Sequence, residues 1–178
     1  MRLGASVVHK GSFQGYWQVY GGLPSLLRSS YFWISVVITI ISYSFWSQND
    51  ATSNEPKWIS ITLQVIPNLM GFALGGMAIM LSFSTGRFLE AIRQNGRKDS
   101  YFMKVIASFF HFTTVLGLAL LTAVMAKVFP NCKWISGFGF FASVYGVMLA
   151  VATVDHLWQT AVIFNQVKHG KKDDGAGE

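Results

Sequence analysis

The segment around position 68 combines amide, proline and glycine residues within an otherwise apolar stretch. The residues concerned are Gln64, Pro67, Asn68, Gly71, Gly75 and Gly76. Pro67 removes a backbone hydrogen bond and should kink a helix. Asn68 can satisfy the freed backbone groups or bond to another helix, and the Gly71-x-x-x-Gly75 spacing lets a second helix approach closely. Close packing within one chain is the first interpretation; a pore-lining or gating kink and a contact between subunits are the alternatives.

A second group of polar residues lies in the later apolar segments. Its members are His111, Asp155, His156 and Gln159. We interpret His111 as a neutral imidazole bonded to a neighbouring helix, with a protonation switch as the alternative. Asp155 is the only acid in the apolar segments and falls near the cytoplasmic interface, where an acid costs far less than at the bilayer centre. It is expected to be hydrated and paired with Arg87, Arg93 or His111. The alternative is a functional polar cluster at the inner mouth of a helix bundle.

A third candidate site is the basic connection between the second and third apolar segments. It contains Arg87, Arg93, Arg97 and Lys98. Short basic connections are typical of the cytoplasmic side of membrane proteins. An exposed basic face there can also bind anionic lipids or a soluble cytoplasmic protein, whereas direct nucleic-acid binding is disfavoured.

Motifs for enzymatic chemistry are missing from the sequence. It has no glycine-rich phosphate loop, no paired cysteines and no His-x-x-x-His pattern. The single cysteine, Cys132, can form neither an intrachain disulfide nor a metal site alone. We therefore expect a protein that is not an enzyme and that needs no cofactor or metal.

The first two candidate sites lie in long apolar segments and the third connects two of them. The chain has four such segments, each long enough for a membrane span, which requires about 20 residues. The predicted fold is an all-α integral membrane protein, a four-transmembrane-helix bundle. The predicted spans cover about 23–47, 58–83, 102–128 and 134–157, with helical cytoplasmic extensions at 84–94 and 158–168. A cytoplasmic N-terminal segment (1–22) and a flexible tail (169–178) complete the prediction.

Composition and charge distribution support a multi-pass membrane protein. Apolar residues make up 52% of the chain and charged residues only 12%, whereas soluble domains carry about 25% charged residues. Eleven lysines and arginines lie in the N-terminal segment, the middle connection and the tail, against three in the other two connections. The excess predicts that both termini face the cytoplasm. Trp46, Trp58 and Trp134 should then form an aromatic belt at the outer face.

Three stretches resemble a known group of bacterial proteins. They are the run Ile66–Ile79, the basic loop 87–97 and the sequence Val162-Ile163-Phe164-Asn165-Gln166. Over roughly residues 60–168 the chain is similar to four-span phage-defence membrane proteins of the RexB and KwaA type. The resemblance implies a bacterial inner-membrane protein that serves phage defence, either as an oligomeric pore or as the membrane sensor of a two-component system.

The expected function is a non-enzymatic membrane component of a defence or stress system, acting as an oligomeric sensor or anchor for a cytoplasmic effector. Its partners would be membrane lipids, further copies of the chain and a soluble cytoplasmic protein. Because four short spans cannot enclose a wide aqueous path, a homo-oligomer with closed symmetry is expected, with a tetramer favoured. The alternatives are an oligomeric pore that depolarises the membrane and a small-solute transporter. The transporter is disfavoured because no inverted repeat is evident.

Overall fold

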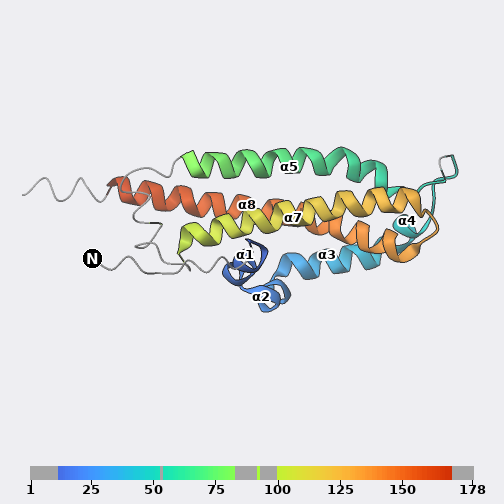
Figure 1. Ribbon diagram of the computed structural model, residues 1–178, viewed down its shortest axis with the longest axis horizontal. Helices are drawn as coiled ribbons and strands as arrows, with labels where there is room; N and C mark the ends of the chain where they lie inside the picture. Colours follow the sequence, from blue (N-terminus) through green and yellow to red (C-terminus); the bar gives the residue numbers. More distant parts are fainter. Residues whose placement is uncertain (1–11, 53, 83–91, 93–99, 170–178) are drawn as a thin grey trace, which may run out of the picture.

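The structure is a computed structural model, and it describes residues 12–52, 54–82, 92 and 100–169. Its secondary-structure elements are helices, and the described residues contain no strand beyond an isolated bridge between Asn49 and Pro56. The helices are α1 (Ser12–Tyr20), α2 (Gly22–Arg28), α3 (Ser30–Ile41), α4 (Tyr43–Ser47), α5 (Trp58–Ser82), α7 (Tyr101–Val128) and α8 (Lys133–His169). The predicted all-α class is therefore confirmed (Figure 1).

Three of the described helices are long and apolar enough to cross a membrane, namely α5, α7 and α8. Each begins within a residue of the second, third or fourth predicted span. Helix α8 continues without a break to His169, through the range 158–168 in which a helical extension was expected. The extension predicted at 84–94 lies outside the described residues except for Ile92, and the tail is described only at His169.

The first predicted span, 23–47, is not one helix. It is divided at Ser29 and Ser42 into α2, α3 and α4, and α2 and α3 meet at an angle of 63°. Ser29 has an extended backbone (φ −71°, ψ 122°), so the helical hydrogen-bond pattern stops there. The pair α2 and α3 is apolar enough for one broken span or for a re-entrant segment.

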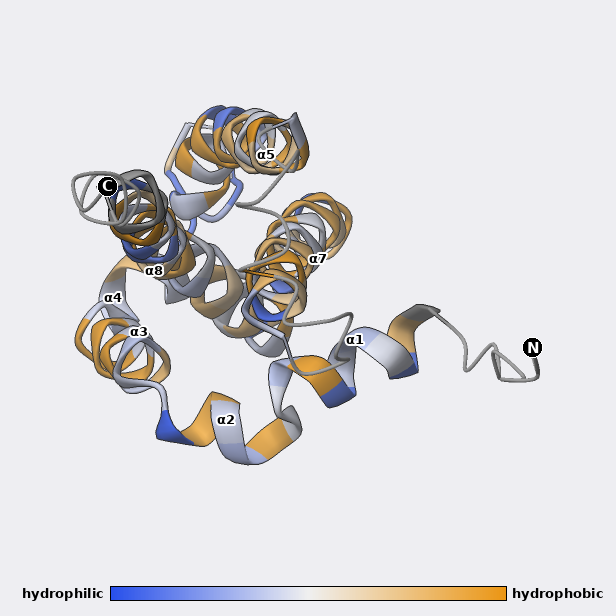
Figure 2. Ribbon diagram, turned by 90° about the vertical axis from the view of Figure 1, so that its left-hand side faces the viewer, coloured by the Kyte–Doolittle hydropathy of each residue, from blue (hydrophilic) through white to orange (hydrophobic). Residues whose placement is uncertain are grey.

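The long helices form a bundle with α7 and α8 at its centre. Helix α5 packs on both α7 and α8, while α3 and α4 pack on α8. Figure 2 shows α3, α5, α7 and α8 end-on, whereas α1 and α2 are seen from the side. Helix α1 contacts α7, so the N-terminal helices lie across the bundle rather than along it.

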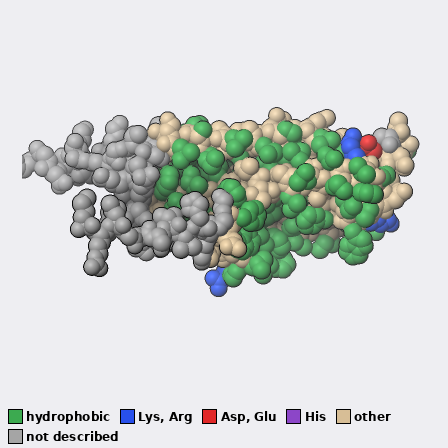
Figure 3. Space-filling model, in the orientation of Figure 1, with side chains coloured by type: hydrophobic (Ala, Val, Ile, Leu, Met, Phe, Trp, Pro, Cys, Tyr) green, Lys and Arg blue, Asp and Glu red, His purple; other side chains and the backbone are tan. Residues whose placement is uncertain are grey.

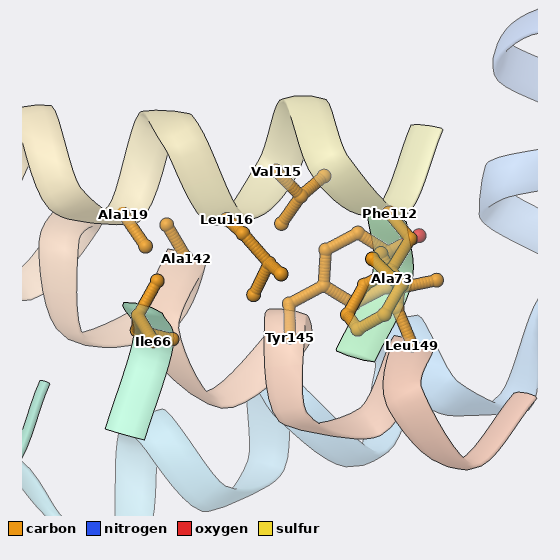
Figure 4. Close-up of a cluster of buried hydrophobic side chains, with 9 residues drawn as sticks. All are labelled: Ile66, Ala73, Phe112, Val115, Leu116, Ala119, Ala142, Tyr145 and Leu149. Carbon is orange, nitrogen blue, oxygen red and sulfur yellow. The ribbon is translucent and has the colours of Figure 1, made fainter. Parts of the chain in front are cut away.

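The bundle core is made of apolar side chains from α5, α7 and α8. Figure 4 shows how these side chains meet between the three helices. The buried cluster comprises Ile66, Ala73, Phe112, Val115, Leu116, Ala119, Ala142, Tyr145 and Leu149. Gly146 of α8 faces Leu116 so closely that an added Cβ would lie 2.8 Å from Leu116 Cδ2. Small residues thus let α7 and α8 approach each other, as is typical of membrane helices.

The three tryptophans that were predicted to form an aromatic belt differ in their exposure. Trp134 is 90% exposed, but Trp58 is 1% exposed and packs inside the bundle. The Trp58 indole donates a hydrogen bond to Ser136 Oγ at 2.8 Å, and Ser136 in turn donates to the Trp46 carbonyl. Burial of Trp58 is possible because its N–H group finds this partner.

The surface of the described bundle is largely hydrophobic along its length. Figure 3 shows green side chains over α3, α5 and α7, with the charged side chains of this face at one end and at its lower edge. At the end of the bundle where α7 finishes, Lys127 forms an ion pair with Glu55 at 3.2 Å. An apolar flank with charge near its ends is what a bilayer requires of a spanning bundle.

Candidate functional site

The predicted polar and glycine residues of α5 mostly share its outward face. Gln64, Pro67, Asn68, Gly71 and Gly75 are all exposed. Their spacing of three or four residues places them on one side of a helix. A Cβ added at Gly71 or Gly75 would meet no atom within 4 Å. This face therefore makes no close contact with another described helix of the same chain.

Only Gly76 of this group packs inside the chain. A Cβ added there would lie 2.9 Å from Phe109 Cε1 on α7. The first interpretation, packing within the monomer, thus applies to Gly76 but not to Gly71 or Gly75.

The two amides on the outward face are poorly satisfied. Asn68 Nδ2 donates to the Gln64 carbonyl at 2.9 Å. Pro67 has no N–H group, so the backbone carbonyl of Leu63, four residues earlier, loses its helical hydrogen bond. Asn68 does not replace that bond, because it donates to Gln64 instead. Within the described residues neither amide side chain bonds to another helix. Asn68 lies ten residues, or about 15 Å, along α5 from Trp58. If α5 spans a membrane, this amide lies near its middle, where unsatisfied polar groups are costly.

His111 is enclosed by aromatic side chains. It is 4% exposed, and its Nε2 lies 3.3 Å from Tyr145 Oη on α8. Tyr20 of α1 stacks on the imidazole, with ring centroids 4.2 Å apart and an interplanar angle of 24°. Burial raises the pKa of the Tyr20 phenol above its ordinary value of 10.0, so the phenol stays protonated near neutral pH. His111 Nδ1 has no hydrogen-bond partner among the described residues.

The structure does not gather His111, Asp155, His156 and Gln159 into one cluster. Asp155 and Gln159 are exposed and bond to each other on α8, Nε2 to Oδ2 at 2.8 Å. His156 faces α7 instead, with its Nε2 3.4 Å from Ser108 Oγ. Asp155 therefore does not pair with His111, because the two residues point into different surroundings. The other expected partners, Arg87 and Arg93, lie outside the described residues, as do Arg97 and Lys98.

Helix α1 was not predicted from the sequence, although its aromatic residues have a helical spacing. Phe13, Tyr16, Trp17 and Tyr20 recur at helical spacing and form the aromatic side of α1. Tyr16 meets Phe110 with ring centroids 4.5 Å apart. Two further residues, Arg28 and Lys104, line a cavity together with His156 and were not predicted as site residues. Their long sequence separation concealed this arrangement.

Comparisons with known proteins add no assignment. No family model, curated protein or solved structure matches this chain. Among the described residues, no three His, Cys, Asp or Glu side chains lie close enough together to hold a metal ion.

Proposed function

We propose that this chain is a subunit of a homo-oligomer in the bacterial inner membrane, assembled through the outward face of α5, with a tetramer favoured. It acts without enzymatic activity of its own, as a membrane sensor or anchor for a cytoplasmic effector. The resemblance to phage-defence proteins of the RexB and KwaA type suggests a defence or stress system as its setting.

The observation that carries the proposal is the exposure of Gln64, Asn68, Gly71 and Gly75 on one membrane helix. A bilayer offers no hydrogen-bond partners to the two amides. A second copy of α5 offers both partners and a matching glycine surface, because a homo-oligomeric contact brings like or complementary faces together. Assembly thus removes a polar defect that the single chain leaves in lipid.

The proposed topology has four spans with both termini in the cytoplasm. The charge excess supports this orientation. Helices α3 and α4 together cover residues 30–47, about 27 Å of helix, which is close to the hydrocarbon thickness of roughly 30 Å. In this arrangement the broken first span reaches the inner surface through α2.

Assembly is tested by native mass spectrometry of the purified full chain in gentle detergent. The wild type should appear as a closed oligomer, and Gly71→Leu with Gly75→Leu should yield monomers, since leucine side chains separate the α5 faces. Asn68→Leu should weaken each contact by about 0.6–2 kcal/mol. Gly117→Leu is the matched control, because Gly117 on α7 also has open space around it. A monomeric wild type would refute the proposal.

The α5 face also supports a second candidate, an oligomeric pore. The core of a single chain is apolar, so a conducting path would have to run between subunits and use Gln64 and Asn68. Voltage-dye measurements during activation separate the two modes. A pore predicts depolarisation that disappears with Asn68→Leu, whereas a sensor or anchor predicts no depolarisation with either protein.

A further inference from the structure

We infer that a cavity between α1, α2, α3, α7 and α8 binds a phosphate group, carried by a phospholipid headgroup or by a free phosphate compound. The cavity has a volume of about 650 Å³. This falls within the range of small-molecule sites, roughly 300–1,000 Å³. It belongs to a single chain and therefore does not depend on assembly through α5.

The walls of the cavity supply cations and hydrogen-bond donors from five helices or their ends. Arg28 ends α2, Lys104 lies in the first turn of α7, and His156 belongs to α8. Hydroxyl groups also line the cavity, from Tyr20, Ser25, Ser29, Tyr31, Ser108 and Thr153. Those of Ser108 and Thr153 already donate to backbone carbonyls of their own helices. In proteins, phosphate oxygens accept hydrogen bonds from guanidinium, ammonium and hydroxyl groups.

The positive charge of the cavity is not neutralised by the described lining. None of the described lining residues is acidic, and neither Arg28 nor Lys104 pairs with a described carboxylate. The acid nearest to His156 in the sequence is Asp155. Its carboxylate is exposed and accepts a hydrogen bond from Gln159. An anion entering the cavity would therefore meet two cationic groups that have no carboxylate partner among the described residues.

His156 provides a further sign of a missing partner. Its Nε2 lies near Ser108, but its buried Nδ1 has no hydrogen-bond partner among the described residues. Buried polar atoms are normally paired. This atom has no solvent-exposed surface, so a ligand oxygen in the cavity would reach it only after the imidazole rotates.

The depth of the cavity matches a lipid headgroup layer. Lys104 lies 24 residues, or about 36 Å, from the far end of α7, and His156 lies 23 residues, or about 35 Å, from the start of α8. Those two helix ends lie together, joined by a short connection. A hydrocarbon core is roughly 30 Å thick, so the cavity sits just beyond it. Basic pockets between helices at this level are suited to anionic headgroups.

The test measures binding to the purified full chain in mild detergent by native mass spectrometry and by thermal shift. The lipid probes are phosphatidylglycerol and diacylglycerol, which share acyl chains but differ in the phosphate. The soluble probe is inorganic phosphate, compared with chloride at equal ionic strength. Phosphatidylglycerol should bind and diacylglycerol should not.

The key variant is Arg28→Gln with Lys104→Gln, which should weaken phosphate-dependent binding at least about tenfold because two charge-assisted hydrogen bonds are lost. The control is Lys57→Gln with Lys133→Gln, which removes the same charge from exposed positions at the opposite end of the bundle. Arg28→Lys with Lys104→Arg keeps the charge and should retain most of the binding. A C-terminal reporter verifies that each variant inserts in the same orientation.

The possible outcomes distinguish a lipid phosphate from a soluble phosphate, and both of these from a cavity that binds no phosphate. Binding of phosphatidylglycerol alone identifies a lipid site, and binding of inorganic phosphate as well identifies a site open to soluble phosphate compounds. Equal binding of diacylglycerol, or equal loss in the opposite-end control, would overturn the inference. So would unchanged binding in the Arg28 and Lys104 double variant. Because the oligomeric state is read from the same spectra, loss of assembly and loss of binding are seen separately.

Discussion

Single glycines on α8 determine how closely its neighbours approach. An added Cβ at Gly139 would lie 2.4 Å from Trp58 Cη2 and 3.0 Å from Cζ2. The Trp58 indole cannot easily move, because it is buried and bonded to Ser136. By contrast, a Cβ at Gly117 on α7 would meet nothing within 4 Å. The two glycines thus lie in similar helices but in opposite steric surroundings.

We predict that Gly139→Ala lowers stability by about 1–3 kcal/mol through overpacking. Gly117→Ala, the control, should be neutral or stabilising by roughly 0.5–1 kcal/mol, because alanine favours helix. Melting temperatures in mild detergent measure both. In a Trp58→Phe background, the smaller ring should remove most of the Gly139→Ala cost. Equal melting temperatures for the Gly139 and Gly117 variants would contradict the prediction.

At the level of elements, α1 is held by its aromatic side. Tyr16 packs on Phe110 and Tyr20 stacks on His111. The opposite side carries Gln14 and Gln18, which are exposed. His111 lies 17 residues, or about 26 Å, from the far end of α7. In a membrane-spanning bundle, α1 would therefore cross near one limit of a hydrocarbon core of roughly 30 Å. This position suits an interfacial helix.

We predict that Tyr16→Ala with Tyr20→Ala releases α1 from α7. Each aromatic pair contributes about 0.5–1.5 kcal/mol, so the two together should raise local opening about tenfold or more. Hydrogen exchange of the peptide covering residues 12–20, with the protein in nanodiscs, measures the change. Gln14→Ala with Gln18→Ala is the control on the opposite side. If both pairs of substitutions give the same exchange rates, the lipid surface rather than α7 holds α1.

For the whole molecule, the broken first span leaves two topologies to be distinguished. If α2, α3 and α4 cross the membrane, the two termini lie on the same side. If they form a re-entrant segment, the termini lie on opposite sides, because α5, α7 and α8 alone cross three times. The side of the N-terminus relative to that of the C-terminus therefore separates the two arrangements.

We predict a cytoplasmic N-terminus, because the lysine and arginine excess favours that side. Reporters that are active on only one side of the membrane should be fused at the N-terminus, after Asp50, after Gln94, after Asn131 and at the C-terminus. The N-terminal, Gln94 and C-terminal fusions should report the cytoplasm, and the other two the opposite side. A cytoplasmic signal at Gln94 and the C-terminus with an external N-terminus would establish the re-entrant arrangement. An external signal at Gln94 would refute the orientation itself.

Several features of this protein followed from the sequence. The helical class and the starts of α5, α7 and α8 were predictable from the sequence. An uncharged apolar run can be recognised locally, and its length can be compared directly with the thickness of a bilayer. The unusual residues around Asn68 were also evident, although their orientation was not. The aromatic spacing of α1 was present in the sequence, but nothing local indicated that α7 would be its partner.

The tertiary structure alone decided which faces point inward and which distant residues meet. In a soluble protein the polar side of a helix marks the outside, but lipid is as apolar as a protein core, so hydrophobicity does not distinguish a lipid-facing leucine from a buried one. The outward direction of Gly71 and Gly75, the burial of Trp58 and the break at Ser29 therefore depend on how the helix surfaces fit together. The same fit brings Arg28, Lys104 and His156 around one cavity from positions far apart in the chain.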